Sequence, residues 1–277
     1  MNLLKIISVA SVIIMLGSCK KDRAGLTEEP GKAKIAIVNL VTPNRPSSTT
    51  TASGLLGYYL FMDNVRLFTQ SLIPNKTTGY LAAEPGNRSI RIDSTETVVN
   101  AIKPSAAVNS TALQAEAGKY YSVFYTGKVQ SPEVVVTTDD LSRPPAGKSK
   151  IRVINLSPDA GALDIAGAFT TATTLPTVLF PNLTYKTQPV FSQIDAGFYK
   201  LEVRRSGVAT AIGTFTQSNQ VIPSFIPGGS IQANFNMNFE SGMVYTLVIR
   251  GYATPSLAAV GQLANPLSVG ALINVYF

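Results

Sequence analysis

Two aspartates in the second half of the chain, Asp159 and Asp164, are the best candidates for a functional pair. Carboxylate oxygens are ligands that calcium prefers, so the two side chains can hold this ion if the fold brings them together. The alternative is structural, because an aspartate directly after a proline, here Pro158, is typical of a tight turn. We favour the turn and keep calcium binding as the alternative.

Other catalytic chemistry is limited by the residue types that the chain lacks. It has no histidine, and its only cysteine is Cys19. Without imidazole, Ser-His-Asp triads and His-based zinc sites are excluded. A carboxylate pair of the glycosidase kind and a Ser-Lys dyad remain, but neither has a recognisable pattern here. We therefore predict a protein that is not an enzyme and that binds no cofactor and no metal.

The single cysteine ends an apolar N-terminal segment with the sequence Leu16-Gly17-Ser18-Cys19. The uncharged run over residues 6–16 follows Lys5 and is shorter than the roughly 20 apolar residues of a membrane-spanning helix. This segment resembles a bacterial lipoprotein signal peptide. We predict removal of residues 1–18, lipidation of Cys19, and a polar tether over residues 19–31. The predicted location is the envelope of a Gram-negative bacterium, lipid-anchored to the outer membrane and facing the periplasm or the cell surface.

Composition favours a folded, strand-rich chain. Hydrophobic residues make up 45% and charged residues 14%, and β-branched residues are frequent together with Ser, Gly, Pro and Asn. The net charge is +7, but the basic residues are spread along the chain. Because an exported lipoprotein rarely meets nucleic acid, we predict no nucleic-acid partner.

The chain repeats itself after the tether. Residues 32–40 return as residues 148–156 with five of the nine positions identical, and Gly118-Lys-Tyr-Tyr121 returns as Gly242-Met-Val-Tyr245. We predict a duplicated domain, with one unit over 32–141, a linker over 142–147 and a second unit over 148–277. Each unit has its own alternating apolar pattern, so we expect each to fold alone. Asp139-Asp140 is expected to belong to a solvated linker rather than to a metal site.

The apolar period within each unit is two, which is typical of strands with one buried and one solvated face. On one such strand Tyr199, Leu201 and Val203 are expected to point inward, and Lys200, Glu202 and Arg204 into water. The expected strands of the first unit are 34–41, 57–62, 66–69, 78–82, 88–93, 119–126 and 132–138. This pattern predicts two tandem immunoglobulin-like antiparallel β-sandwiches, and the Gly-x-x-Tyr sequences are typical of a tyrosine corner.

The opening of the second unit, residues 151–165, resembles the bacterial domain-of-unknown-function family 4397. Its motif runs roughly Val-Arg-Val-x-His-Ala-Ser-Pro-Asp-Ala-Pro-x-Val-Asp-Val. The matching positions are Ser157, Pro158, Asp159, Ala160 and Asp164, and Asn155 stands where the family usually has histidine. The resemblance implies exported or surface-attached sandwiches, often in tandem, and implies no reaction. Asn39 and Asn155 are expected to hydrogen-bond loop backbone at the end of the core.

The predicted function is that of a non-enzymatic envelope protein with a structural or partner-binding role. The first alternative is accessory glycan binding through Tyr58-Tyr59 and Tyr120-Tyr121, and the second is a carboxylate-dependent glycoside-active enzyme. If the protein binds a partner, the loops at 43–54, 98–114 and 218–238 are expected to carry the binding site, since loops vary while packed strands do not. The alternative is that these loops are only tolerated insertions. Asp93-Ser94-Thr95 resembles an O-glycosylation acceptor triplet, so Ser94 or Thr95 is a candidate modification site.

Overall fold

The computed structural model describes residues 29–41, 57–94, 97–98, 101–102, 107–128, 131–187, 190–212, 234–251, 253 and 267–275. All the regular elements in these ranges are β-strands, so the predicted all-β class is confirmed. Within the same ranges there is no helix long and apolar enough to cross a membrane. The predicted leader and Cys19 lie outside the described residues.

Ten of the described strands lie in the first part of the chain. Eight of them make two four-stranded sheets, β10-β9-β1-β4 and β3-β2-β5-β8, which enclose a core between their facing sides. The other two, β6 and β7, pair only with each other. The strands are β1 Ala33–Asn39, β2 Tyr58–Met62, β3 Val65–Arg66, β4 Lys76–Ala83, β5 Gly86–Ser94, β6 Thr97–Val98, β7 Ala101–Ile102, β8 Ala107–Ala115, β9 Tyr120–Lys128 and β10 Ser131–Asp139.

Eight further strands form a second sandwich from the sheets β14-β11-β17-β18 and β13-β12-β15-β16. Its first strand begins nine residues after β10 ends, since 148 − 139 = 9. The strands are β11 Lys148–Asn155, β12 Leu163–Phe169, β13 Thr177–Leu183, β14 Ser192–Asp195, β15 Gly197–Arg205, β16 Asn234–Phe239, β17 Val244–Arg250 and β18 Ser268–Val275.

The two sandwiches share one topology. The sheet order β4-β1-β9-β10 corresponds to β14-β11-β17-β18, and β3-β2-β5-β8 corresponds to β13-β12-β15-β16. Among the described strands, pairing is antiparallel except that β1 runs parallel to β9 and β11 runs parallel to β17. This differs from the purely antiparallel arrangement that was expected. The first and the penultimate strand of a unit are far apart in sequence, so no hairpin turn forces them to run in opposite directions.

One strand of the first sandwich is missing from the sequence-based prediction. β8 pairs with β5 over nearly its whole length, although residues 98–114 were assigned to a loop. Its only well-buried hydrophobic side chains are those of Leu113 and Ala115, and most of its other residues are polar or half-exposed. A strand that contributes so little to the core lacks the apolar alternation by which strands are recognised. In the second sandwich, residues 234–238 of the expected loop likewise belong to β16.

A tyrosine near the start of β9 and of β17 closes each core in the same way. The backbone N–H of Glu116 donates a 3.1 Å hydrogen bond to the hydroxyl of Tyr121, and that of Glu240 donates a 3.0 Å bond to Tyr245. Both rings are buried in the core of their own sandwich. The hydroxyl group of each ring is therefore hydrogen-bonded to the backbone just before its strand begins, as in a tyrosine corner.

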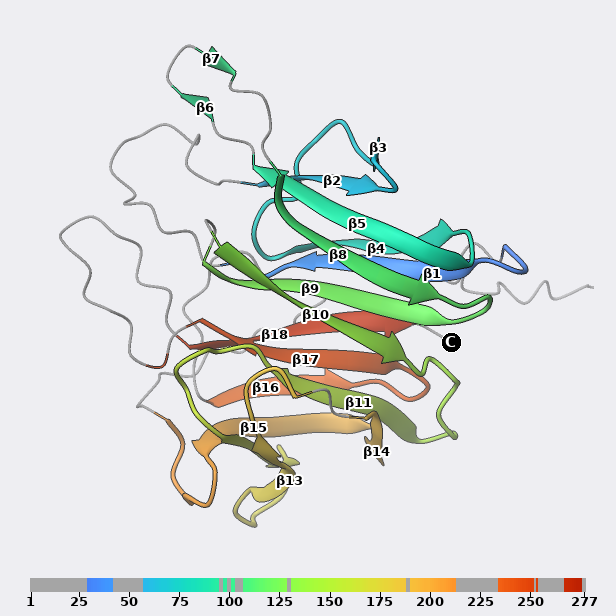
Figure 1. Ribbon diagram of the computed structural model, residues 1–277. Helices are drawn as coiled ribbons and strands as arrows, with labels where there is room; N and C mark the ends of the chain where they lie inside the picture. The colour runs from blue at the N-terminus through green and yellow to red at the C-terminus, as the bar shows by residue number, and fades with distance from the viewer. Residues whose placement is uncertain are drawn as a thin grey trace, which may run out of the picture.

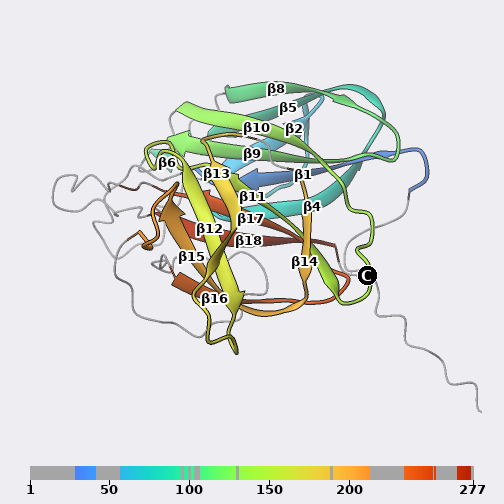
Figure 2. The same ribbon diagram turned by 90° about the horizontal axis from the view of Figure 1, so that it is seen from below.

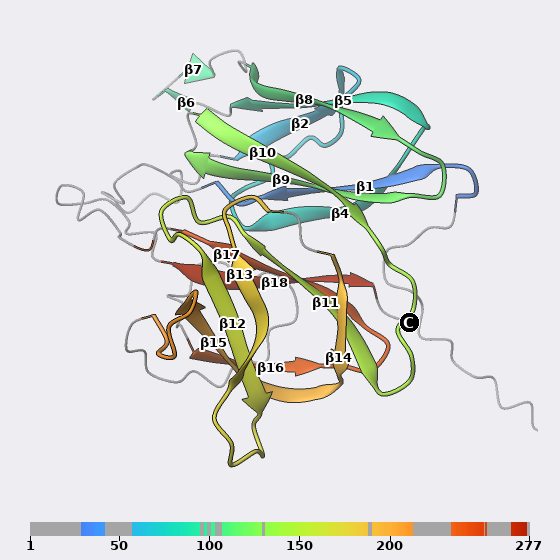
Figure 3. The same cartoon turned by 60° about the horizontal axis from the view of Figure 1, so that its bottom comes forward.

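The two sandwiches are stacked into four layers of sheet, with β4-β1-β9-β10 and β14-β11-β17-β18 as the inner two (Figures 1, 2 and 3). All seven residues of β1 are buried, and so are all residues of β11 except Lys148. The prediction of one solvated face per sheet is thus wrong for these two sheets. In each of these sheets, the face that points away from the core of its own sandwich is covered by the other sheet. The expectation that each unit folds alone did not include this interface.

A second difference concerns β15. Lys200 is exposed as predicted, but Glu202 and Arg204 on the same face are only 9% and 8% exposed. The guanidinium of Arg204 lies 2.6 Å from the Glu202 carboxylate and also donates to the carbonyl of Pro176. The chain leading into β13 therefore covers part of a face that was expected to be open, and the two charges neutralise each other.

Candidate functional site

Apolar side chains from both sandwiches form a continuous cluster in the middle of the interface between the inner sheets. The side chain of Phe124 is fully buried there. A smaller cluster at one side of the interface joins Leu141 and Val244 with the rings of Tyr80, Tyr120 and Phe191. Burying such surfaces together is favourable by about 25 cal/mol per Å² of apolar area. The central cluster consists of Val38, Leu40, Phe124 and Val135 from the first sandwich and Ile154, Leu156, Val248 and Leu272 from the second.

A buried ion pair crosses this interface. Arg152 Nη2 of β11 lies 2.6 Å from Asp139 Oδ1 at the end of β10, and their side chains are 1% and 0% exposed. The contact is close, although it lacks the linear geometry of a good hydrogen bond. The guanidinium also lies over the ring of Phe191, with its central carbon 4.5 Å from the ring centroid. The buried negative charge of the first sandwich is thus balanced by a buried positive charge of the second.

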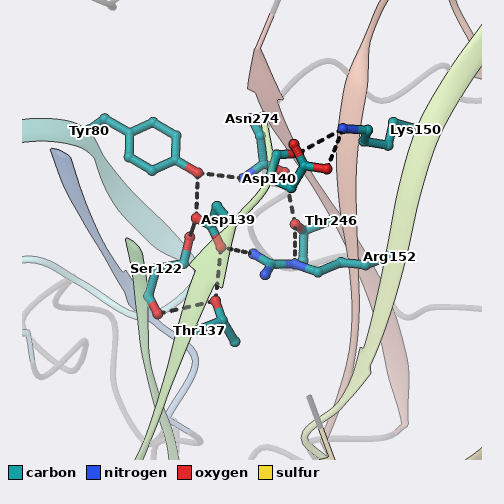
Figure 4. Close-up of polar contacts among 9 residues, drawn as sticks. All are labelled: Tyr80, Ser122, Thr137, Asp139, Asp140, Lys150, Arg152, Thr246 and Asn274. Carbon is teal, nitrogen blue, oxygen red and sulfur yellow. Dashed lines mark hydrogen bonds and ion pairs between the residues drawn. The ribbon is translucent and has the colours of Figure 1, made fainter. Parts of the chain in front are cut away.

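The Asp139 carboxylate accepts hydrogen bonds from three hydroxyl groups of its own sandwich (Figure 4). Tyr80 and Ser122 donate to Oδ2 over 2.6 and 2.5 Å, and Thr137 donates to Oδ1 over 2.9 Å. Burial, and then the nearby charge of Asp139, raise the pKa of the Tyr80 hydroxyl, which therefore stays protonated as a donor. A carboxylate so surrounded is held in one position and is well compensated for its loss of water.

The second sandwich completes the network from its own side. Arg152 Nε donates to Thr246 Oγ1 over 3.0 Å, and this hydroxyl donates to Asn274 Oδ1 over 2.8 Å. The Asn274 amide then donates across the interface to the Tyr80 hydroxyl over 2.9 Å. Figure 4 shows that these hydrogen bonds and the ion pair form a closed ring through Asp139, Arg152, Thr246, Asn274 and Tyr80. Two strands of each sandwich are therefore linked by polar contacts as well as by apolar packing.

Lys150 fastens the linker beside this network. Its ammonium lies 2.8 Å from Asp140 Oδ2 and donates to Ser142 Oγ over 2.6 Å. The hydrogen bond from Lys150 is the largest cause that lowers the pKa of Asp140 to about 2. The contact joins the two residue types of a Ser-Lys dyad, but such a dyad needs a neutral lysine as its base. Here the lysine donates at the same time to a carboxylate and to the serine hydroxyl, and we interpret the arrangement as a structural clasp.

Polar contacts also cross the opposite side of the interface. Thr126 Oγ1 donates to the carbonyl of Leu156 over 3.2 Å, and Lys186 pairs with Glu133. Arg250 donates to the side-chain oxygen of Asn75, and burial lowers the pKa of this arginine to about 10. The apolar cluster thus has polar contacts on both sides.

The sequence-based prediction for Asp139 was wrong. Asp140 is exposed as expected, but the carboxylate of Asp139 is inaccessible to water and bound by four side chains. An aspartate beside a Pro- and Gly-containing linker looks solvated unless its partner across the interface is known. One signal was present in the sequence, because Arg152 interrupts the apolar run of β11 where the first unit has Ala36.

The two predicted amides do hold loop backbone at the end of the core. Asn155 Nδ2 donates to the carbonyls of Gly161 and Leu183 over 3.0 and 2.9 Å, and its Oδ1 accepts from the N–H of Ser157 over 3.0 Å. Asn39 makes the corresponding contacts with Leu72 and Val41. The expectation for both residues is confirmed.

The remaining residues of the motif form a turn directly after Asn155. Ser157 is fully buried, whereas Pro158 and Asp159 are exposed. Asp159 Oδ1 accepts from the hydroxyl of Ser157 over 3.4 Å and from the backbone N–H of Ala253 over 2.8 Å. The carboxylate therefore ties the turn after β11 to the chain that follows β17.

Asp164 occupies a different environment from Asp159. Its Oδ1 accepts from the N–H of Asn182 over 2.7 Å, and its Oδ2 from that of Gly207 over 3.1 Å. Burial alone would raise the pKa of Asp164, but these two backbone bonds, a bond from Ser206 and the charge of Arg204 lower it overall. In the described part of the chain no three His, Cys, Asp or Glu side chains gather as metal ligands. The contacts of Asp159 agree with the turn that was favoured for it, and Asp164 binds backbone N–H groups of two other segments.

The first sandwich and the start of the second are similar to a known protein family. Residues 33–166 match the family described as Domain of unknown function (DUF4397). This part of the chain is similar to that family. The DUF4397 match begins at the first residue of β1, spans the first sandwich and continues through Asn155 and Asp164 into β12. The resemblance inferred from the motif is confirmed. No curated protein matches the sequence.

In each of the two aromatic pairs one tyrosine is buried in the core and the other is half-exposed. Tyr58 and Tyr121 are buried, as strand alternation requires. Tyr59 lies under the guanidinium of Arg66, 3.8 Å from the ring centroid, and Tyr120 packs edge-on against Tyr80. Ser94 ends β5, but its side chain and Thr95 lie outside the described residues, as do the expected loop 43–54 and most of 218–238.

Replacing Asn155 with alanine is expected to lower the free energy of unfolding by about 2–3 kcal/mol, because buried carbonyl and N–H groups lose their partners. Asn39→Ala removes one fewer hydrogen bond and should have a smaller effect. Urea denaturation followed by circular dichroism measures both. Asn87, which is exposed on β5, provides the control, and its alanine variant should change stability by less than about 0.5 kcal/mol. Equal stabilities for Asn155→Ala and Asn87→Ala would contradict this role.

Proposed function

We propose that the protein is a non-enzymatic, lipid-anchored component of the cell envelope that presents a binding or structural surface on a rigid body of two sandwiches. The observation that carries this proposal is the interface between the inner sheets, where an apolar cluster and a closed polar ring join the two units. A body joined in this way keeps a fixed spacing and orientation between its two ends. Such rigidity suits a protein that holds a surface away from a membrane.

The anchoring part of the proposal is supported by the sequence before the first strand. The Leu16-Gly17-Ser18-Cys19 sequence fits lipidation of Cys19, and β1 begins at Ala33, 14 residues later, since 33 − 19 = 14. At no more than about 3.5 Å per residue, such a tether reaches roughly 50 Å when fully extended. The anchor would therefore keep the sandwiches near the membrane, on the outer membrane of a Gram-negative bacterium.

The non-enzymatic part is supported by how the interface uses its reactive groups. Carboxylate, lysine, arginine, serine and tyrosine side chains all meet there, as they would in an active site. Each of them is engaged in a fixed contact with another protein group, and Asp139 and Arg152 are covered on all sides. A catalytic group needs access to substrate and a changeable proton position. Asp139 and Arg152 have the opposite properties, and their contact joins the two sandwiches.

We also propose that each sandwich is immunoglobulin-like. The tyrosine hydroxyls of Tyr121 and Tyr245 bind backbone five residues upstream, which is the bonding pattern of a tyrosine corner. The shared strand order of the two units supports their origin by duplication. The glycan-binding alternative receives less support, because Tyr59 and Phe61 on the outer face of β2 lie under Arg66 and Arg91 instead of presenting free ring faces.

The anchor is tested by metabolic labelling with a clickable fatty acid. We expect the wild-type protein to carry the label and to sediment with membranes, and Cys19→Ala to carry none, because the thiol that accepts the lipid is gone. The Cys19→Ala protein should be soluble or should keep its leader. Ser18→Ala is the matched control, since a small residue at this position preserves the recognition sequence and the label. A labelled Cys19→Ala protein would disprove the proposal.

A further inference from the structure

We propose that the two inner sheets contact each other through equivalent, self-complementary docking surfaces, each on the face that points away from the core of its own sandwich. We also propose that the Arg152–Asp139 pair makes the first sandwich dock on the second rather than on a copy of itself. This inference concerns the surface between the sandwiches and does not depend on lipidation. It identifies both the partner that the surface fits, a second unit of the same fold, and the residues that select it.

Strand pairing provides the equivalence between the two faces. β1 pairs with β9 as Val38 with Phe124, and β11 pairs with β17 as Ile154 with Val248. Each of these residues therefore occupies the same place in its own sheet as its counterpart does in the other. All four belong to the central apolar cluster, together with the equivalent residues Leu40 and Leu156. Corresponding positions meet at the centre of the interface, which is the arrangement of a two-fold symmetric contact.

The polar ring also includes residues at equivalent positions of the two sandwiches, but some of its side chains differ in charge between them. The hydroxyls of Ser122 and Thr246 occupy equivalent positions, and they donate to Asp139 and Asn274, respectively. The acceptor of this hydroxyl is thus a carboxylate in the first sandwich and a neutral amide in the second, where Asn274 lies at a register shift of β18. In the adjacent strand the difference is reversed, because the position of Arg152 in β11 corresponds to Ala36 in β1. Both faces carry an equivalent buried lysine, Lys34 or Lys150, and beyond these one face bears the buried anion Asp139 and the other the buried cation Arg152.

This difference decides which pairing is favourable. Two first sandwiches joined through this face would bury two Asp139 carboxylates with no cation from either Ala36. Two second sandwiches would bury two Arg152 guanidiniums with no carboxylate from either Asn274. Only the mixed pair brings the Asp139 carboxylate and the Arg152 guanidinium together, and a buried charge without a partner is strongly unfavourable. The apolar cluster provides attraction that all three pairings share, and the charges discriminate among them.

The experiment uses the full chain with a protease site inserted between Ala146 and Gly147, which are exposed in the linker. After cleavage we expect the two fragments to remain together as a one-to-one complex in native mass spectrometry. The complex is then unfolded in urea and refolded. Mass spectrometry counts the mixed pairs, which contain one first and one second sandwich, and the like pairs, which contain two copies of the same sandwich. For the wild-type sequence, mixed pairs should exceed like pairs by about tenfold or more. In the Asp139→Asn, Arg152→Met double variant, the proportions should approach random pairing.

A matched control replaces the half-exposed ion pair that crosses the same interface, as Glu133→Gln with Lys186→Met. Because this pair remains in contact with water, the excess of mixed pairs should persist. If refolding is inefficient, the ratio is measured without denaturant by diluting the cleaved complex until it dissociates and then concentrating it. Fragments that separate on cleavage would overturn the docking surface. Wild-type fragments that form like pairs as readily as mixed pairs, or a double variant that keeps the full excess, would overturn the selecting role of the ion pair.

Discussion

Replacing Arg152 with methionine is expected to lower the free energy of unfolding by about 3–5 kcal/mol, because Asp139 remains buried and loses the cation that balances it. Methionine is long and flexible enough to fill most of the space, so the effect reports the lost charge more than a cavity. Urea denaturation at neutral pH, followed by circular dichroism, measures the change.

Two further variants separate this effect from a general loss of charge. Lys148→Met breaks the pair with Asp195, whose side chains are 42% and 62% exposed, and should lower stability by less than about 1 kcal/mol. The Arg152→Met, Asp139→Asn double variant should recover most of the loss, since no charge is then left buried. A loss below about 1 kcal/mol for Arg152→Met would show that the pair does not stabilise the interface.

Much of the fold could be predicted because alternating side chains mark a strand with one face in the core. Tyr199, Leu201 and Val203 point inward as their spacing requires. The covering of the inner sheets was missed, although the sequence contains a sign of it. Residues 35–38 read Ile-Ala-Ile-Val without a polar interruption, and residues 247–249 read Leu-Val-Ile. Uninterrupted apolar runs are typical of strands buried on both faces.

In the candidate site, too, the contacts that depend on local sequence could be predicted, whereas those with partners distant in sequence could not. Asn39 and Asn155 could be placed because strand parity puts them at the end of the core, where a buried amide must bind backbone. The partner of Asp139 could not be found, because it depends on which face of β11 meets which face of β10. Asp159 and Asp164 are close in sequence but bind different segments, so their spacing alone does not bring the two carboxylates into one site.

Replacing Phe124 with alanine is expected to lower the free energy of unfolding by about 3–5 kcal/mol and to separate the unfolding of the two sandwiches. The ring is fully buried in the apolar cluster shared by both units, so its removal leaves a cavity between the inner sheets. The cores within each sandwich do not contain this residue. The coupling between the units should therefore weaken more than either unit does.

Differential scanning calorimetry tests this expectation. The wild-type protein should unfold in a single transition, since the interface makes opening of either unit unfavourable, and Phe124→Ala should show two transitions with the first at lower temperature. Phe198 on β15 provides the matched control, because it is 54% exposed and its replacement by alanine removes the same atoms from the surface. Phe198→Ala should keep the single transition and lose less than about 1 kcal/mol. If Phe124→Ala behaves like Phe198→Ala, the apolar cluster does not couple the two sandwiches, and the stiffness of the body must come from the linker clasp at Lys150 and Asp140 instead.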